Sequence, residues 1–273
     1  MSKQDIFKAL DSLVGLQSVK HEIREIVNEL AIQTCTGSVQ AGLVTRNYAF
    51  IGNPGTGKST VAEIFGRILK DIGALPEGQV VTVTRADLVG SYVGASGQKT
   101  RQAVEKAHGG ILFIDEAFSL RFGDDDVFGQ EALDTLLCLM ENRRGDFICI
   151  FSGCPEETKR FLDSLPGLKS RIGRILMFED FTPSELMELF MKMKGILPMD
   201  PEAGQLLADK FERMYAERGP DFGNARMVKN LLKEIETRMR SRDISGGLSD
   251  GAGFNELIDH MFSNFRITKE DII

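Results

Sequence analysis

The sequence predicts an α/β fold with a parallel central sheet, followed by a smaller all-α domain. Three observations support this prediction. Short apolar runs alternate with amphipathic helical patterns as far as residue 180. A glycine-rich loop stands between one of these runs and the helical pattern after it. Beyond Asp180 the patterns are helical only, so we expect one domain over residues 1–180 and a second over residues 181–273.

The first strand and the loop after it are the centre of the predicted α/β domain. Residues 48–51 form a short apolar run, typical of a buried parallel strand. The next residues have the pattern Gly-x4-Gly-Lys-Ser of a Walker A phosphate loop, in which backbone N–H groups point at a polyphosphate. Lys58 is placed to reach the β- and γ-phosphates, and the Ser59 hydroxyl to bind Mg²⁺. The residues expected around the nucleotide are Gly52, Asn53, Pro54, Gly55, Thr56, Gly57, Lys58, Ser59 and Thr60.

A helical pattern follows the loop directly and ends near Gly73. Its apolar face consists of Val61, Ile64, Phe65, Ile68, Leu69 and Ile72. A strand before the loop and a helix after it distinguish a phosphate loop from a chance glycine-rich turn. The positive N-terminal end of that helix also favours a bound anion. We therefore predict that the chain binds a nucleoside triphosphate.

The stretch after the next expected strand, Gln79–Val83, contains an unusual loop. Thr84 and Asp87 have the spacing of a capping box and predict one helical turn. Tyr92 then stands between two glycines in a loop without apolar alternation, which a core position explains poorly. Local sequence alone favours a turn that happens to hold a tyrosine, but the position of this loop between the phosphate loop and the motif at residues 111–116 favours a functional role. An amphipathic helix is expected over Ser96–His108.

A second motif follows at residues 111–116, where four apolar residues precede Asp115 and Glu116. Ligands of parallel sheets bind beyond the carboxyl ends of the strands. Asp115 is therefore placed to hold Mg²⁺ through water, and Glu116 to orient and polarise the attacking water. This Walker B pattern predicts hydrolysis of the nucleotide as well as binding.

Two more strands complete the expected sheet, at Phe147–Phe151 and Ile175–Phe178. Arg171 and Arg174 precede the last strand. From local sequence alone, a functional role for these arginines and a role as ordinary surface cations are equally compatible with the pattern. Helix starts are expected at Thr182–Glu185, Asp200–Pro201 and Gly223–Arg226. A Gly/Ser linker over 245–253 and a final helix over 256–262 are expected, with Ile267 and Ile272 docking at a place that the sequence does not specify.

Composition limits the classes of function. The net charge of −7 argues against the overall basic surface that nucleic-acid binding usually needs. The four cysteines show no metal-site spacing, and Cys138 and Cys149 lie in apolar runs, where buried thiols are expected. No segment has the apolar length of a signal peptide or a membrane span, so a soluble protein of a reducing cytosol is expected.

Together the Walker motifs, the alternating strands and helices and the all-helical end resemble the AAA+ ATPases, which have the P-loop NTPase fold and a helical lid. The narrower resemblance is to the CbbX/CfxQ group, which includes red-type Rubisco activase, relatives of stage V sporulation protein K and the ATPase module of type VII secretion proteins. It rests on the segments FIGNPGTGKST, VTRADLVGSYVG, GGILFIDEAFSL, GQEALDTLLCLMENRRGDF, LPGLKSRI and FGNARMV. These cover roughly residues 12–240.

This resemblance implies ATP and Mg²⁺ as cofactors and gives roles to further residues. Val14 and Gly15 match a turn that lies against adenine, and Arg226 matches the sensor-2 arginine of the lid. Many AAA+ proteins have Asn or Thr at the sensor-1 position, at the end of a strand. Here that strand ends at Ser152, so sensor 1 is either Ser152 or missing. Ser59 and Asp115 match the residues that hold the metal.

The resemblance also implies partners. Tyr92, with Val93 beside it, matches the pore-loop aromatic that grips a threaded polypeptide. Arg171 matches the arginine finger that a neighbouring subunit supplies, and Arg174 is a second candidate. These roles imply a ring-shaped homo-oligomer, in this family a hexamer, and a protein client whose identity the motifs do not select.

The leading hypothesis is a cytoplasmic, ATP-hydrolysing protein remodeller that pulls on a client polypeptide, with no membrane partner and no nucleic acid. Two alternatives are a nucleotide-switched assembly scaffold with slow ATP hydrolysis and a DNA-directed AAA+ loader. A switch needs no pore aromatic, and a loader usually has a basic inner surface. Tyr92 and Glu116 therefore favour the first hypothesis.

Overall fold

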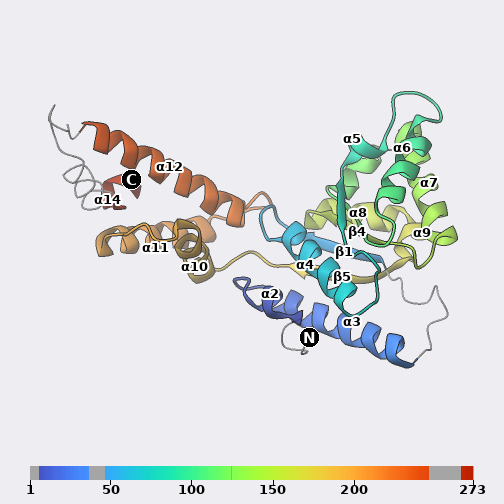
Figure 1. Ribbon diagram of the computed structural model, residues 1–273. Helices are drawn as coiled ribbons and strands as arrows, with labels where there is room; N and C mark the ends of the chain where they lie inside the picture. The colour runs from blue at the N-terminus through green and yellow to red at the C-terminus, as the bar shows by residue number, and fades with distance from the viewer. Residues whose placement is uncertain (1–5, 37–46, 124, 246–265, 273) are drawn as a thin grey trace, which may run out of the picture. The chain divides into compact units, whose positions relative to one another are not determined.

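The computed structural model describes residues 6–36, 47–123, 125–245 and 266–272 (Figure 1). The chain divides into two compact units, Met1–Asn53 with Gly57–Glu179, and Pro54–Thr56 with Asp180–Ile273. We refer to them as the sheet unit and the helical unit. The expected linker after residue 245 and the expected helix over 256–262 lie outside the described residues.

The sheet unit contains a five-stranded sheet in which every neighbouring pair is parallel. Its order is β2-β3-β4-β1-β5. The strands are β1 (Asn47–Gly52), β2 (Val80–Val83), β3 (Ile111–Ile114), β4 (Ile148–Gly153) and β5 (Ile172–Phe178). A parallel sheet followed by helices confirms the predicted fold class.

Helices cover both faces of this sheet, because alternate residues of each strand point to opposite sides. Tyr48 and Phe50 of β1 belong to the core beneath α3 (Gln17–Thr36) and α4 (Lys58–Asp71). Ala49 and Ile51 belong to the opposite core, beneath α6 (Ala95–Lys106), α7 (Val127–Asn142) and α8 (Pro155–Ser164). Figure 1 shows these helices on the two sides of the strands. The remaining elements of the unit are α2 (Lys8–Asp11), α5 (Arg85–Leu88), the 3₁₀ helix η1 (Ala117–Leu120) and α9 (Pro166–Lys169).

The helical unit packs α10 (Pro183–Lys194), α11 (Pro201–Ala216), α12 (Asn224–Ser245) and α14 (Lys269–Ile272) around its own apolar core. The expected capping box at Thr182 is present, since its backbone N–H donates to Glu185 at 2.8 Å and its hydroxyl accepts from the Glu185 backbone at 3.3 Å. Ile267 and Ile272 are 0% and 1% exposed, which confirms the expectation that these two side chains dock.

One thiol differs from expectation. Cys149 is buried in β4, but Cys138 is exposed on α7. Leu136 and Met140 of α7 face the core, and in a helix the residue midway between them lies on the opposite side. Among the described residues, none of the helices has both the length and the apolar character needed to cross a membrane.

Candidate nucleotide-binding site

The strand order brings the two Walker motifs to one edge of the sheet. β4 lies between β1, which leads into the phosphate loop, and β3, which leads into Asp115 and Glu116. All three strands are parallel, so their carboxyl ends meet at this edge, which we call the carboxyl edge. Ser152, near the end of β4, therefore lies between the two motifs.

The phosphate loop ends in a tight backbone turn that leads into α4. Gly57 caps α4 with φ of +94°, a left-handed conformation that favours glycine. The Lys58 ammonium donates to the carbonyl oxygens of Gly52 at 2.7 Å and Asn53 at 2.8 Å, so it lies over the loop. Ser59 and Thr60, in the first turn of α4, are exposed. The N-terminus of this 14-residue helix is thus open to an anion.

At the end of β3, Asp115 is connected to Ser152. The buried Ser152 hydroxyl donates to Asp115 Oδ1 at 3.2 Å, and the Glu116 backbone N–H donates to the same oxygen at 3.2 Å. Glu116 itself is exposed. The hydrogen-bonded Asp115 carboxylate therefore lies next in sequence to the Glu116 carboxylate, which water and nucleotide can reach.

The turn between α2 and α3 adds residues from the start of the chain. Val14 is buried, Gly15 has φ of +59°, and Leu16 has φ of +58°. A Cβ built on Gly57 would lie 3.6 Å from Leu16 Cδ1, so this turn lies beside the start of α4. The residues predicted to contact adenine are therefore next to the phosphate loop within the sheet unit.

Strained backbone coincides with these motifs. Within the described residues, the non-glycine residues with positive φ are Leu16 at +58°, Glu116 at +50° and Asn224 at +47°. Such conformations cost about 1–3 kcal/mol each and cluster at functional sites. Each of the three residues lies in or beside a motif predicted to contact the nucleotide.

Arg171 and Arg174 lie at the opposite edge of the sheet, which we call the amino edge. Arg171 directly precedes β5, and its carbonyl accepts from Asn47, the first residue of β1, at 3.2 Å. β1 has six residues, so about 16 Å separate its two ends. An arginine side chain is too short to span that distance, so neither arginine is brought to the phosphate loop of its own chain.

These two arginines have different partners. Arg174 forms ion pairs with Glu22 at 2.8 Å, Glu25 at 3.0 Å and also Glu29, all on α3. Hydrogen bonds to Glu25 and Glu22 hold the pKa of Arg174 above its ordinary value. Arg171 donates to the Gly167 carbonyl at 2.6 Å and lies 3.3 Å from a Glu141 oxygen at the surface.

Tyr92 and Val93 are 66% and 84% exposed. Figure 1 shows the connection between α5 and α6, which carries them, as a loop that extends away from the sheet. Apolar side chains this exposed gain nothing from the core, so the loop is not explained by packing. We call residues 89–94 the Tyr92 loop.

In the helical unit, Arg226 is exposed in the first turn of α12. The neighbouring Asn224 is buried, and its amide donates to the carbonyl of Pro54 at 3.3 Å and to Asp180 at 2.8 Å. Its amide oxygen accepts from the Phe181 N–H at 2.9 Å. Sequence reasoning named Arg226 and missed Asn224. The available signal was Gly-Asn before a helix, because Asn tolerates the left-handed conformation.

The donor set suits Mg²⁺ bound together with a nucleotide. Mg²⁺ usually binds one or two protein oxygens plus substrate phosphates, and not a cage made of protein alone. Accordingly, no group of three or more His, Cys, Asp or Glu able to hold a metal occurs among the described residues. The Ser59 hydroxyl and the Asp115 carboxylate would hold the ion, which neutralises charge on the phosphates.

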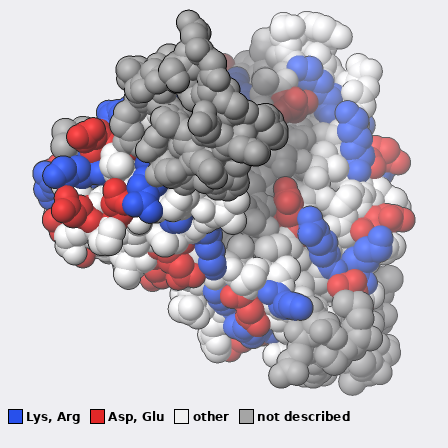
Figure 2. Space-filling view, turned by 60° about the vertical axis from the view of Figure 1, so that its left-hand side comes forward, with Lys and Arg blue, Asp and Glu red and all other residues white. Residues whose placement is uncertain are grey.

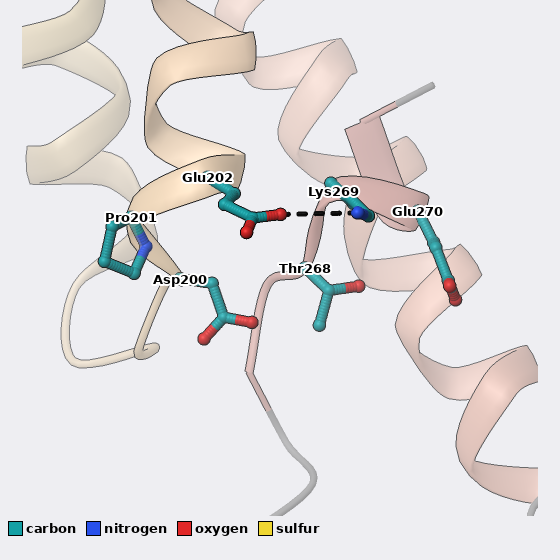
Figure 3. A pocket seen from close by; sticks show the side chains of 6 residues that line it. All are labelled: Asp200, Pro201, Glu202, Thr268, Lys269 and Glu270. Atoms are coloured by element: carbon teal, nitrogen blue, oxygen red, sulfur yellow. Dashed lines mark ion pairs between the residues drawn. The ribbon is translucent and has the colours of Figure 1, made fainter.

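A cavity of the helical unit has a lining that does not suit a nucleotide. A cavity of about 360 Å³ in the helical unit lies between the starts of α11 and α14 (Figure 3). It is lined by Asp200, Pro201, Glu202, Thr268, Lys269 and Glu270. Its one cation, Lys269, pairs with Glu202 at 3.3 Å, and the other carboxylates would repel phosphate. On the face drawn in Figure 2, positive and negative side chains are intermixed, without one continuous basic patch.

Comparisons with known proteins agree with the motifs. Residues 48–180 match the model of the ATPase family associated with various cellular activities (AAA), and residues 182–272 match that of the AAA lid domain. Protein CfxQ of Xanthobacter flavus is 39% identical over 90% of this chain and 79% of its own length. The chloroplastic ribulose bisphosphate carboxylase/oxygenase activase of Cyanidioschyzon merolae is 40% identical over 88% and 83%. Stage V sporulation protein K of Bacillus subtilis is 36% identical over 85% and 73%.

Proposed function

Because the chain belongs to the AAA ATPase family, and within it to the CfxQ, CbxX and Rubisco activase type, we propose that it is an ATP-driven protein remodeller. In this proposal several copies form a ring, a hexamer, and the Tyr92 loops pull a client polypeptide through its centre. The family assignment carries ATP hydrolysis itself. The ring, the pulling and the client are the proposed parts.

Each residue of the carboxyl edge has a role in hydrolysis. Lys58 and the phosphate-loop N–H groups bind and orient the polyphosphate. Glu116 orients and polarises the water that attacks the γ-phosphate, and the bond to the bridging oxygen breaks to give ADP and phosphate. Ser152 fixes the rotamer of Asp115 through their 3.2 Å hydrogen bond. Val14 and Gly15 support the adenine, and Arg226 responds to the γ-phosphate from the helical unit.

The positions of the arginines support an active site shared between two copies. Arg171 lies at the amino edge, about 16 Å along β1 from the loop that it would serve. A neighbouring copy that docks its amino edge on this carboxyl edge would supply the missing cation. Such head-to-tail contacts form a closed ring when the rotation between successive copies adds up to a full turn. We assign the finger to Arg171, because three carboxylates of its own chain already neutralise Arg174.

The observation that carries the remodelling proposal is the exposure of Tyr92 and Val93. An aromatic ring and a branched aliphatic side chain can press on many sequences without a specific pocket. A scaffold that only switches between assembled states has no use for them. The intermixed surface charge and the net charge of −7 give no support to the DNA-loader alternative.

The names of two relatives indicate two settings, Rubisco activation and sporulation. Rubisco of the red type is the first client to test, because the activase is 40% identical to this chain and the sporulation protein is 36% identical. The proposed client needs only one feature: a polypeptide segment that can enter the centre of the oligomer, where the Tyr92 and Val93 side chains contact it.

The Tyr92→Ala variant tests this proposal. We expect it to lower remodelling far more than it lowers ATP turnover. The aromatic side chain that would grip the polypeptide is lost, while the nucleotide site is intact. Remodelling is measured as ATP-dependent reactivation of sugar-phosphate-inhibited Rubisco, or as ATP-dependent protease sensitivity of a folded, protease-resistant test protein. Tyr92→Phe, which retains the ring, is the matched control. Equal remodelling by Tyr92→Ala and the parent chain would contradict the threading model.

A further inference from the structure

Arg85 is the first residue of α5, the short helix that leads into the Tyr92 loop. Its guanidinium reaches across to the segment that follows the Walker B carboxylates. Nη1 donates to the carbonyl oxygens of Ser119 at 3.0 Å and Leu120 at 2.7 Å. Nη1 and Nη2 also donate to the two carboxylate oxygens of Asp126, at 2.6 and 3.1 Å. One side chain therefore joins α5 to the end of η1 and to the residue before α7.

Asp126 is the second half of this junction. Besides Arg85, it accepts from the backbone N–H groups of Phe122 and Gly129, each at 2.9 Å, and so caps α7. These hydrogen bonds, chiefly the one from Arg85, hold the pKa of Asp126 well below its ordinary value. The Arg85 guanidinium also lies 4.7 Å from the centre of the Phe122 ring. The planar Arg85 guanidinium thus contacts two carbonyl groups, one carboxylate and one aromatic ring. It can therefore move little unless these partners move with it.

The other end of the Tyr92 loop is tied to the same helix. The backbone N–H groups of Gly94 and Gly97 donate to the Glu131 carboxylate, at 3.2 and 3.0 Å. Glu131 lies on α7, one turn after the end that Asp126 caps. The two ends of the Tyr92 loop are thus hydrogen-bonded to η1, Asp126 and α7, and we call these connections the base of the loop.

Glu116 is directly connected to this base. It precedes η1 without an intervening residue, and its backbone has the left-handed conformation. Any change in the position of Glu116 between nucleotide states therefore displaces η1. The η1 carbonyls that Arg85 binds would pass that displacement to α5 and to the loop. Coupling through a chain of packed, hydrogen-bonded groups is the physical form that such transmission takes.

We infer that Arg85 is a positioning residue that makes the Tyr92 loop follow the nucleotide-dependent position of the Glu116 segment. This inference rests on the proposed function and deepens it, because it names the residue through which hydrolysis would drive the loop. Lysine cannot replace the interaction fully, since its single ammonium cannot bind two carbonyls and both oxygens of Asp126 at once.

A fluorescent reporter tests the inference without a client. The chain contains no tryptophan, so Tyr92→Trp introduces a single indole on the loop. Emission is compared in the full chain with ADP and with the non-hydrolysable analogue AMP-PNP. We expect a difference between the two states, and we expect Arg85→Ala to reduce it about fivefold or more, with Arg85→Lys in between. Affinity for AMP-PNP should change by less than about threefold in every variant.

Arg143→Ala is the matched control, because it removes a surface ion pair, at 2.5 Å to Glu105, that joins the far ends of α6 and α7. It should leave the emission difference unchanged. If Arg85→Ala does not fold, Asp126→Asn removes the charge of the partner, keeps an oxygen to cap α7, and should reduce the difference in the same way.

Two results overturn the inference: a full emission difference in folded Arg85→Ala or Asp126→Asn, or no difference between nucleotide states in the parent Tyr92→Trp chain. Both are independent of the remodelling assay. If the proposed function is wrong, the Tyr92→Ala variant will remodel its client normally in the remodelling assay. Failure of this inference appears in the emission signal alone.

Discussion

The carboxyl edge and the amino edge of the sheet carry different halves of the predicted catalytic apparatus. Lys58, Asp115, Glu116 and Ser152 gather at the carboxyl edge, where they can bind nucleotide and activate water. The amino edge carries Arg171, whose side chain is partly exposed. In the proposed ring, these two edges would be complementary, and full activity would depend on contact between neighbouring copies.

Arg171→Ala should have the largest effect on turnover. Loss of an arginine finger lowers the rate about 10³-fold or more. Arg174→Ala is the control three residues away: it should keep turnover within about threefold and lower the melting temperature by about 2–4 °C, because its ion pairs hold α3 on β5. The measurements are steady-state ATPase assays and thermal melts. Equal losses of turnover in the two variants would remove the distinction between these arginines.

Mixing variants sharpens the same comparison. Arg171→Ala lacks a working amino edge, and Lys58→Ala lacks a working carboxyl edge, so mixed rings contain some intact interfaces. Their mixture should exceed the turnover of either variant alone. Mass measurements with ATP must first demonstrate co-assembly. Co-assembled mixtures that never recover activity would argue against a finger supplied by a neighbour.

Glu116→Gln should have the next largest effect, and it acts at the carboxyl edge only. An amide cannot polarise the attacking water, so turnover should fall about 10²–10⁴-fold. ATP affinity should stay within about threefold, because the phosphate loop is unchanged. Glu105→Gln, an exposed glutamate on α6, is the control and should match the parent chain in both measurements. Undiminished turnover in Glu116→Gln would mean that the Walker B motif is misassigned.

Ser152→Ala should have the smallest of these effects. It removes one hydrogen bond to Asp115, worth about 0.5–1.5 kcal/mol, so kcat should fall by no more than about tenfold. KM should change little, since Ser152 does not belong to the phosphate loop. Ser164→Ala, which removes a hydroxyl bonded to the Phe161 carbonyl, is the control. A loss as large as that of Glu116→Gln would make Ser152 a direct contact of the reacting water.

Much of the fold was predictable because its signals are local. A four-residue run such as Ile111–Ile114 must be apolar throughout when helices cover both faces of a parallel sheet. The Thr182 capping box and the Gly-Lys-Ser start of α4 are likewise short-range patterns. The exposure of Cys138 was missed because an apolar run alone does not reveal which face of a helix is turned inward.

The site was predictable only in part. Lys58, Asp115 and Glu116 follow from motifs whose spacing expresses their chemistry. The choice between Arg171 and Arg174 depends on Glu22, Glu25 and Glu29, which lie about 150 residues earlier in the chain. The roles of Asn224 and Arg85 likewise depend on partners far away in sequence. Local patterns carry no information about such contacts.

By itself, the sequence determined that this chain has a nucleotide-binding α/β core with a helical lid, because phosphate binding and buried strands each impose a short, recognisable pattern of residues. Tertiary structure alone decided which side chains meet. The strand order β2-β3-β4-β1-β5 places Ser152 beside Asp115, and the parallel direction of β1 and β5 places Arg171 at the edge opposite its own phosphate loop. The physical reason is that strand pairing brings distant segments together through backbone hydrogen bonds, which any sequence of suitable apolar character can form.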